Sequence, residues 1–292
     1  METIYSKLKE IHSWQRYFPL DDKYYLYSSN LIFACCKISD LYYQLCNARM
    51  GLHFYYDYES FDMVSKDEIS ILNTKKYFLE NSLLYYNFSI DYLWQVLWLF
   101  YNNSDERYRM ATKERYQEEM KKCNFDALLC GLTEIQENKL VEVLKDNFTE
   151  RNELYKKIRE RYNMLKHRAV FHTPGFGMNH EIGMYYIPAV VERQKDGTVM
   201  KSYCVPLIAR EELDLDKLKE ILISFDQQFV TVCEYFIELI VPKEYLATSK
   251  VTVANIVDFN KKHLIELAEY SKRHPEIVKE IPCQVISEEE NS

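Results

Sequence analysis

The segment from Leu83 to Trp98 constrains the fold most strongly, because it is apolar almost all round when it is drawn as a helix. A helix that is apolar on every side is normally buried, so residues 66–101 are predicted to form a helix inside a bundle. Only six Gly and seven Pro occur in the 292 residues. Since both residue types interrupt helices and supply turns, their scarcity disfavours a β-sandwich or barrel. The sequence therefore predicts a mainly α protein.

Polar residues also recur in this segment, at every fourth position: Asn87, Asp91 and Gln95. This spacing places them on one face of the helix. Polar groups on a buried helix need partners. They either bond to a neighbouring helix or line a functional cleft, and the sequence leaves both interpretations open.

Hydrophobic periodicity predicts further helices over residues 22–50, 133–146, 214–240 and 251–272. Residues 104–123 are strongly charged with mixed sign, and they are expected to form an exposed helix.

Several helix boundaries follow from local signals. Gly51 is expected to end the helix before it, and residues 52–65 are expected to form a loop. Residues 124–131 are expected to form a break. Thr133, followed three residues later by Gln136, matches a capping box, so it is expected to start the next helix.

Two β-rich runs, Met184–Arg193 and Thr198–Leu207, flank an Asp-Gly pair, which is a strong hairpin signal. A small β-hairpin over about 184–207 is therefore predicted between the helices. No linker demands a division, so residues 1–272 are predicted to form a single helical domain, with the C-terminal helices over about 210–272. Residues 273–292 are acidic and polar, so they are predicted to be disordered.

The net charge of −8 argues against broad, nonspecific binding of nucleic acid. No signal peptide and no run of about eighteen uncharged apolar residues is apparent, so a soluble, cytoplasmic protein without membrane association is expected. Eight scattered cysteines lack Cys-x-x-Cys and Cys/His ligand spacing. This favours reduced thiols, and no metal or other cofactor is expected.

A basic island interrupts the acidic chain from Glu150 to Arg168, where seven Lys or Arg stand against three Glu. It is predicted to form a helix capped by Thr149 and ended by Pro174, because proline cannot continue a helix. The simplest interpretation is a solvated basic face, whose C-terminal histidine is placed favourably against the helix dipole.

Helix geometry separates the charged groups of this island. Asn163 and His167 share one face, whereas Arg161, Arg168 and His172 line another. Arg161 and His167 are six residues apart, so they lie about 120° from each other around the helix. In one helix, the side chains of Arg161 and His167 could not both contact the same atom of a ligand. Two copies of the helix that face each other across a dimer axis could place one of each at the same atom.

Over Arg161 to His172 the sequence resembles the HEPN superfamily (higher eukaryote and prokaryote nucleotide-binding), and within it an uncharacterised bacterial HEPN-like group with a Lys-His-Arg signature. Arg161 and His167 enclose five residues, which fits the superfamily motif. The resemblance covers about 22–172. It implies a helical bundle, a homodimer formed through the motif helices and, often, metal-independent cleavage of RNA.

The resemblance also implies roles for individual residues. Imidazole suits proton transfer near neutral pH, and guanidinium matches the oxygens of a phosphate. The implied catalytic residues are Arg161 and His167, the implied RNA-phosphate-binding residues are Lys166 and Arg168, and the implied supporting polar residues are Asn163, Asp91, Gln95 and His172.

Three hypotheses of different classes remain. The first is a HEPN-like endoribonuclease of a toxin or phage-defence type. The second is a non-catalytic HEPN-like module that binds nucleotide, RNA or a protein partner such as an antitoxin. The third is a helical scaffold protein whose basic helix is only a solvated face.

Overall fold

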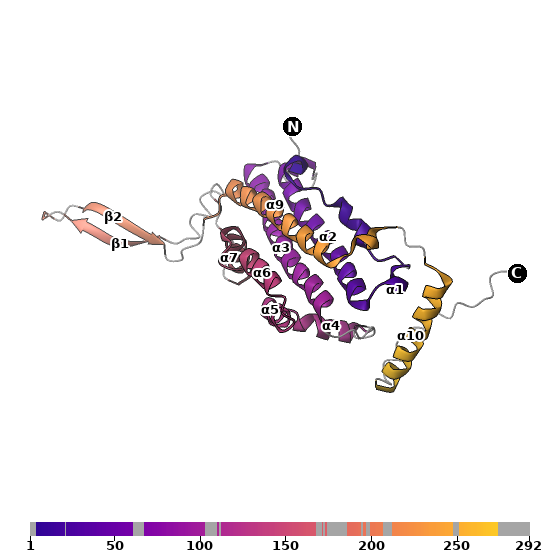
Figure 1. The fold of residues 1–292 in the computed structure, drawn as a ribbon. Helices are drawn as coiled ribbons and strands as arrows, with labels where there is room; N and C mark the ends of the chain where they lie inside the picture. Colours follow the sequence, from indigo (N-terminus) through magenta and orange to yellow (C-terminus); the bar gives the residue numbers. More distant parts are fainter. Residues whose placement is uncertain are drawn as a thin grey trace. The chain divides into compact units, whose positions relative to one another are not determined.

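The computed structural model shows a mainly α protein with one β-hairpin (Figure 1). The residues that it describes are 4–20, 22–60, 67–102, 110, 112–167, 171, 173, 186–193, 195–196, 199–206, 212–247 and 251–273. The α-helices are α1 (Lys23–Leu26), α2 (Ser29–Tyr56), α3 (Glu68–Tyr101), α4 (Lys113–Lys122), α5 (Phe125–Glu134), α6 (Asn138–Phe148), α7 (Glu153–His167), α9 (Leu215–Ile240) and α10 (Val253–Arg273). Short 3-10 helices are η1 (Ile4–Lys7), η2 (His12–Tyr17), η3 (Tyr58–Ser60) and η4 (Lys243–Leu246).

The chain divides into two compact units. The first comprises Met1–Glu10, Tyr43–Ser89 and Leu144–Thr231, and the second comprises Ile11–Tyr42, Ile90–Val143 and Val232–Ser292. Four of the five divisions fall inside α2, α3, α6 and α9, and the fifth lies between η1 and η2. Each unit has its own buried apolar residues, such as Leu52, Leu83 and Phe229 in the first and Leu41, Leu97 and Phe236 in the second.

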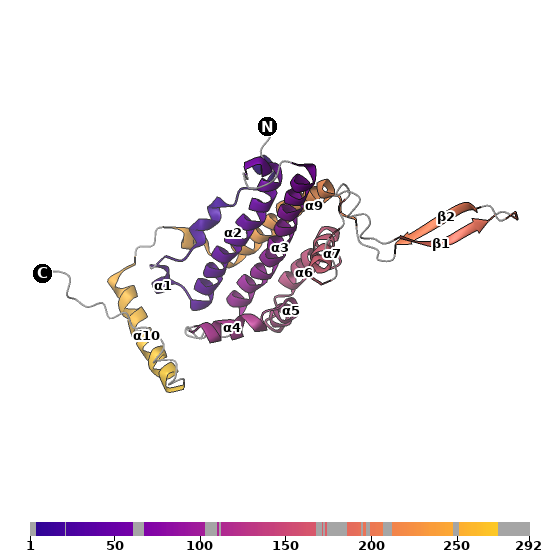
Figure 2. The same cartoon turned by 180° about the vertical axis from the view of Figure 1, so that it is seen from behind.

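In the first unit, α2 and α3 approach each other closely at Gly51. Both views show the two helices side by side (Figures 1 and 2). A Cβ atom at Gly51 would lie 2.6 Å from the carbonyl oxygen of Phe78, and the Ser82 hydroxyl donates to the carbonyl of Ala48 at 2.8 Å. The prediction that Gly51 ends the helix is wrong, because α2 continues to Tyr56. The glycine instead allows two backbones to come together.

The core of the first unit also contains a buried ion pair. Arg49 of α2 donates through Nε and Nη2 to the two carboxylate oxygens of Asp226 of α9, each at 2.8 Å. The Tyr86 hydroxyl donates to the same carboxylate at 2.8 Å. Burial and then the charge of Asp226 raise the pKa of Tyr86 well above its usual value, so this phenol stays neutral and keeps donating.

A different buried cation lies in the second unit. Lys37 of α2 is 4% exposed, and its ammonium donates to Asp40 at 2.9 Å. The same ammonium lies over the rings of Tyr92 and Tyr116, at 4.5 and 5.2 Å from their centroids. Burial lowers the pKa of Lys37, but the hydrogen bond to Asp40 and the interaction with Tyr116 outweigh it, so the pKa is raised overall.

Helix α5 of the second unit corrects the prediction of a break over 124–131. Asn124 caps it by accepting a hydrogen bond from the Ala127 N–H at 2.9 Å. The proposed capping box is also wrong, because Thr133 lies inside α5. Gln136 has a φ of 64°, and the Glu137 N–H bonds to the carbonyl of Leu132, which is the pattern that closes a helix.

The remaining elements differ from the predictions mainly at their ends. The predicted helix over 22–50 is interrupted between α1 and α2, and part of the predicted loop over 52–65 belongs to α2 and η3. Helices α9 and α10 lie close to their predicted bounds. The acidic tail from residue 274 lies outside the described residues. Among the helices that the structure describes, none combines the length and the apolarity needed to cross a membrane.

The hairpin consists of β1 (Tyr186–Arg193) and β2 (Val199–Pro206), which pair antiparallel within the first unit. Lys195 and Asp196 lie in the turn that joins them. The register runs from Tyr186 opposite Pro206 to Arg193 opposite Val199, with irregularities after Pro188 and Glu192.

Candidate functional site

The basic island forms helix α7 of the first unit, but the helix begins later than predicted. Asn152 caps it, because its side-chain oxygen accepts hydrogen bonds from the N–H groups of Leu154 and Tyr155 at 3.0 and 3.1 Å. Thr149, the predicted cap, follows the end of α6 and donates to the carbonyl of Lys145. The described part of α7 ends at His167.

Arg159 links α7 to the polar stripe of α3. Its Nη1 donates to the side-chain oxygen of Asn87 at 3.1 Å, and the Asn87 amide donates to the carbonyl of Leu83 at 2.8 Å. Asn87 is fully buried. The stripe therefore bonds to a neighbouring helix at this position, through an arginine that the sequence analysis did not select.

Arg161, the predicted catalytic arginine, lies against its own helix. Its Nη1 donates to the carbonyl of Lys157 at 3.3 Å. Among the described residues, its buried Nε has no hydrogen-bond partner. Arg161 is only about 60° around the helix from the fully buried Ile158, which explains why part of its guanidinium is inaccessible.

Tyr162 anchors two basic side chains of α7. It is buried, and the guanidinium of Arg159 and the ammonium of Lys166 lie 5.4 and 5.5 Å from the centroid of its ring. Both distances are typical of cation–π contacts. Lys166 is exposed, so its ammonium contacts the Tyr162 ring and remains accessible to solvent.

Asn163, Lys166 and His167 are all exposed, and we call them the exposed end of α7. Their spacings of three and four residues place them on one side of the helix. Within the described part of the chain, neither Lys166 nor His167 has an ion-pair partner. In contrast, Lys156 on the same helix pairs with Glu150 at 3.3 Å.

The predicted site is therefore only partly assembled in one chain. Arg161 and His167 are separated by about 9 Å along the helix axis as well as by the rotation around it. Arg168 and His172 lie outside the described residues.

Asp91 and Gln95 belong to the second unit, and their role as orienting groups stays a prediction. There Asp91 contributes, after burial, to raising the pKa of the Cys123 thiol to about 12. Within the described ranges, no group of three or more His, Cys, Asp or Glu side chains could hold a metal ion.

No family model matches the chain, and no curated protein or solved structure is significantly similar to it.

Proposed function

We propose that the exposed end of α7 binds RNA through its phosphate groups, in a protein of HEPN-like type. The observation that carries this proposal is the exposure of Lys166 and His167 on one side of a helix, without ion-pair partners among the described residues. In a chain of net charge −8, such a surface provides a local attraction for phosphate.

Cleavage of the bound RNA would need two copies of the chain. In a homodimer with the α7 helices near the twofold axis, Arg161 of one copy could reach a phosphate held beside His167 of the other. One imidazole would accept the proton of the 2′-hydroxyl as its oxygen bonds to phosphorus. The imidazole of the second copy would donate a proton to the 5′-oxygen as its bond to phosphorus breaks. Arg161 would stabilise the charge on the phosphate oxygens.

The second candidate is a module that binds RNA, nucleotide or a protein partner without cleaving RNA. The conformation of Arg161 favours this candidate, because its guanidinium bonds to its own helix and is partly buried. In a toxin or phage-defence system, an antitoxin would be such a protein partner. The two candidates share the binding surface and differ in whether Arg161 becomes available.

An RNA cleavage and binding assay in the presence of EDTA separates these candidates. The wild type is expected to bind single-stranded RNA. Lys166→Ala should weaken this binding, and it should reduce the slope of log K against log salt concentration by about one, which corresponds to the loss of one phosphate contact. Lys156→Ala is the matched control, because Lys156 is already paired with Glu150. If the protein cleaves, His167→Ala should abolish cleavage and Arg161→Ala should slow it by roughly 100- to 1000-fold.

The outcomes of this assay distinguish the candidate functions. Binding with EDTA-resistant cleavage supports the ribonuclease, and a monomer by light scattering at micromolar concentration would contradict the shared site. Binding without cleavage supports the second candidate. If the wild type binds no RNA, the proposed RNA-binding surface and the ribonuclease both fail. If His167→Ala also lowers the melting temperature sharply, His167 is a structural residue, as expected for a scaffold protein.

A further inference from the structure

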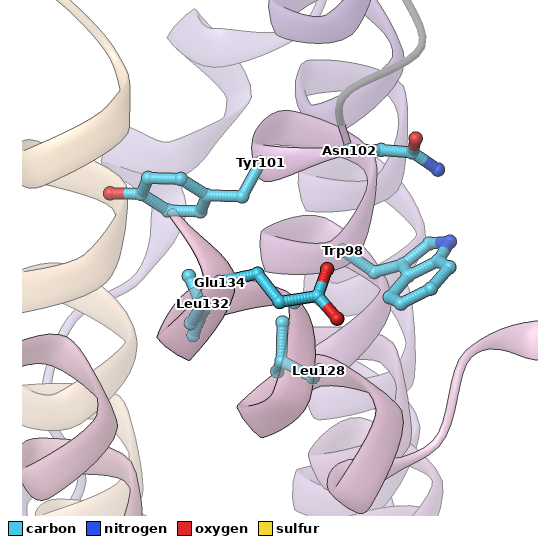
Figure 3. A pocket seen from close by; sticks show the side chains of 7 residues that line it. Trp98, Tyr101, Asn102, Leu128, Leu132 and Glu134 are labelled. Atoms are coloured by element: carbon cyan, nitrogen blue, oxygen red, sulfur yellow. The ribbon is translucent and has the colours of Figure 1, made fainter. Parts of the chain in front are cut away.

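A small pocket of the second unit lies where α3 and α5 both end (Figure 3). Its volume is about 140 Å³. A cavity of about 150 Å³ accommodates a molecule of the size of benzene. The pocket is lined by Trp98 and Tyr101 from the end of α3, by Asn102 just beyond it, and by Leu128, Gly131, Leu132 and Glu134 from α5.

The walls of the pocket are mainly apolar and aromatic. Leu128 and Leu132 are buried, and they form part of the lining from α5. The indole N–H of Trp98 donates to Glu119 at 3.1 Å, and the Asn102 amide donates to the same carboxylate at 2.7 Å. Since its N–H is occupied, the indole can offer only its carbon atoms and its π surface to the pocket.

Gly131 keeps this space open. It lies inside α5, where glycine costs about 1 kcal/mol relative to alanine. A Cβ atom at Gly131 would meet no heavy atom within 4 Å, so helix packing does not require the glycine. This contrasts with Gly51, where a Cβ atom would collide with the backbone of α3. The empty volume at Gly131 therefore calls for another explanation.

The electrostatic surroundings of the pocket are negative. Tyr101 and Glu134 are the last residues of α3 and α5, so the negative ends of two helix dipoles meet here. The carboxylate of Glu134 points toward the ring of Trp98 in Figure 3. Neither Glu134 nor Glu137, just beyond the end of α5, forms an ion pair with any described residue.

The pKa values of two neighbouring side chains, Cys130 and Tyr101, are consistent with these negative surroundings. The thiol of Cys130 donates to Glu134 at 3.5 Å, and the Glu134 carboxylate raises its pKa. Burial, followed by the charge of Glu137, raises the pKa of Tyr101 to about 12. Both shifts are in the direction that a nearby negative charge produces in an acidic group.

We propose that this pocket binds a small organic ammonium ion. The aromatic side chains of Trp98 and Tyr101 would contact the groups around its nitrogen, and Glu134 would be the counter-ion. An anion would meet the Glu134 carboxylate, which has no ion-pair partner among the described residues, and two helix C-termini, so it is excluded. A neutral apolar molecule would fit the walls but would leave the negative charge unused. The site is independent of the RNA-binding surface proposed for the first unit.

Calorimetric titration with choline and with its neutral carbon analogue, 3,3-dimethylbutan-1-ol, tests the proposal. These molecules have nearly the same shape and differ in charge. Choline should bind with a dissociation constant on the order of 1 mM or below, and the neutral alcohol at least about tenfold more weakly. Equal binding of the two molecules, or no binding of choline at about 20 mM, would overturn the proposal.

Two pairs of variants locate the binding site. Gly131→Leu should fill the pocket and abolish choline binding, whereas Gly131→Ala should leave binding measurable, and both should keep the fold because each raises helix propensity. Glu134→Gln should weaken binding by about tenfold. Glu118→Gln, on the exposed side of α4, is its control and should have no effect. Choline binding that survives Gly131→Leu in a folded protein would contradict this location.

Discussion

Arg49 and Lys37 lie twelve residues apart on the same helix, α2, and both are buried, but their charges are balanced in different ways. The guanidinium of Arg49, in the first unit, forms a bidentate ion pair with the fully buried carboxylate of Asp226 from α9. The ammonium of Lys37, in the second unit, meets two tyrosine rings and a carboxylate, Asp40, whose side chain is 48% exposed.

The difference shows that a buried cation does not by itself indicate how much a fold depends on it. The pair of Arg49 and Asp226 is closed to water, so the removal of either partner leaves an uncompensated charge inside the protein. The charge of Lys37 is balanced partly by Asp40, whose carboxylate is half exposed, and partly by the faces of the Tyr92 and Tyr116 rings. We therefore expect stability to depend strongly on the first pair and weakly on the second.

Asp226→Asn should have the largest effect. It leaves the Arg49 guanidinium buried without a carboxylate, which should lower the free energy of unfolding by about 3–5 kcal/mol. The midpoint of urea denaturation measures this loss. The double variant Arg49→Met/Asp226→Leu is the control, because it removes both charges and should recover most of the stability. A double variant as unstable as Asp226→Asn would show that the shape of the pair matters more than its charge.

Lys37→Met should have an intermediate effect, of about 1 kcal/mol at pH 7, which corresponds to the lost cation–π contacts. The folded state raises the pKa of Lys37, so it favours the charged form. This stabilisation is complete below the unfolded-state pKa of about 10.4 and is lost as the pH rises through the higher folded-state value. Melting curves of both proteins at increasing pH should therefore converge above about pH 10.4. A difference that does not change with pH would contradict the role of the charge.

Asp40→Asn should have the smallest effect, below about 1 kcal/mol, because the Asp40 carboxylate is half in solvent. Added salt should reduce the difference between wild type and variant further. Thermal melts at low and high salt would measure it. A loss as large as that of Lys37→Met would mean that the carboxylate, rather than the tyrosine rings, holds the lysine.

The long helices could be predicted from the sequence because their signal is repeated over many residues. Helix α3 is apolar around most of its surface, and α9 carries a sustained apolar face. Neither buried cation of α2 was predicted. The partner of Arg49 lies 177 residues away, so no local pattern connects the two.

Helix α5 and the start of α7 could not be predicted because competing local signals point elsewhere. Gly131 inside α5 resembles a break, and Thr133 with Gln136 resembles the start of a helix rather than its end. Asn152 and Thr149 are both good capping residues, and the contacts of α6 decide between them. Of the predicted site, the sequence located the basic helix and its exposed end. The partial burial of Arg161 depends on packing around α7 that the motif does not encode.

The close approach at Gly51 has a mechanical consequence for the first unit. Residues 49 and 51 are about 200° apart around α2, so they hold opposite sides of the same turn. On one side the backbone of α3 is a steric stop, and on the other the two-pronged ion pair is a tether to α9. The stop opposes translation toward α3 and the tether opposes rotation about the helix axis. This turn of α2 is therefore held from two sides within the first unit.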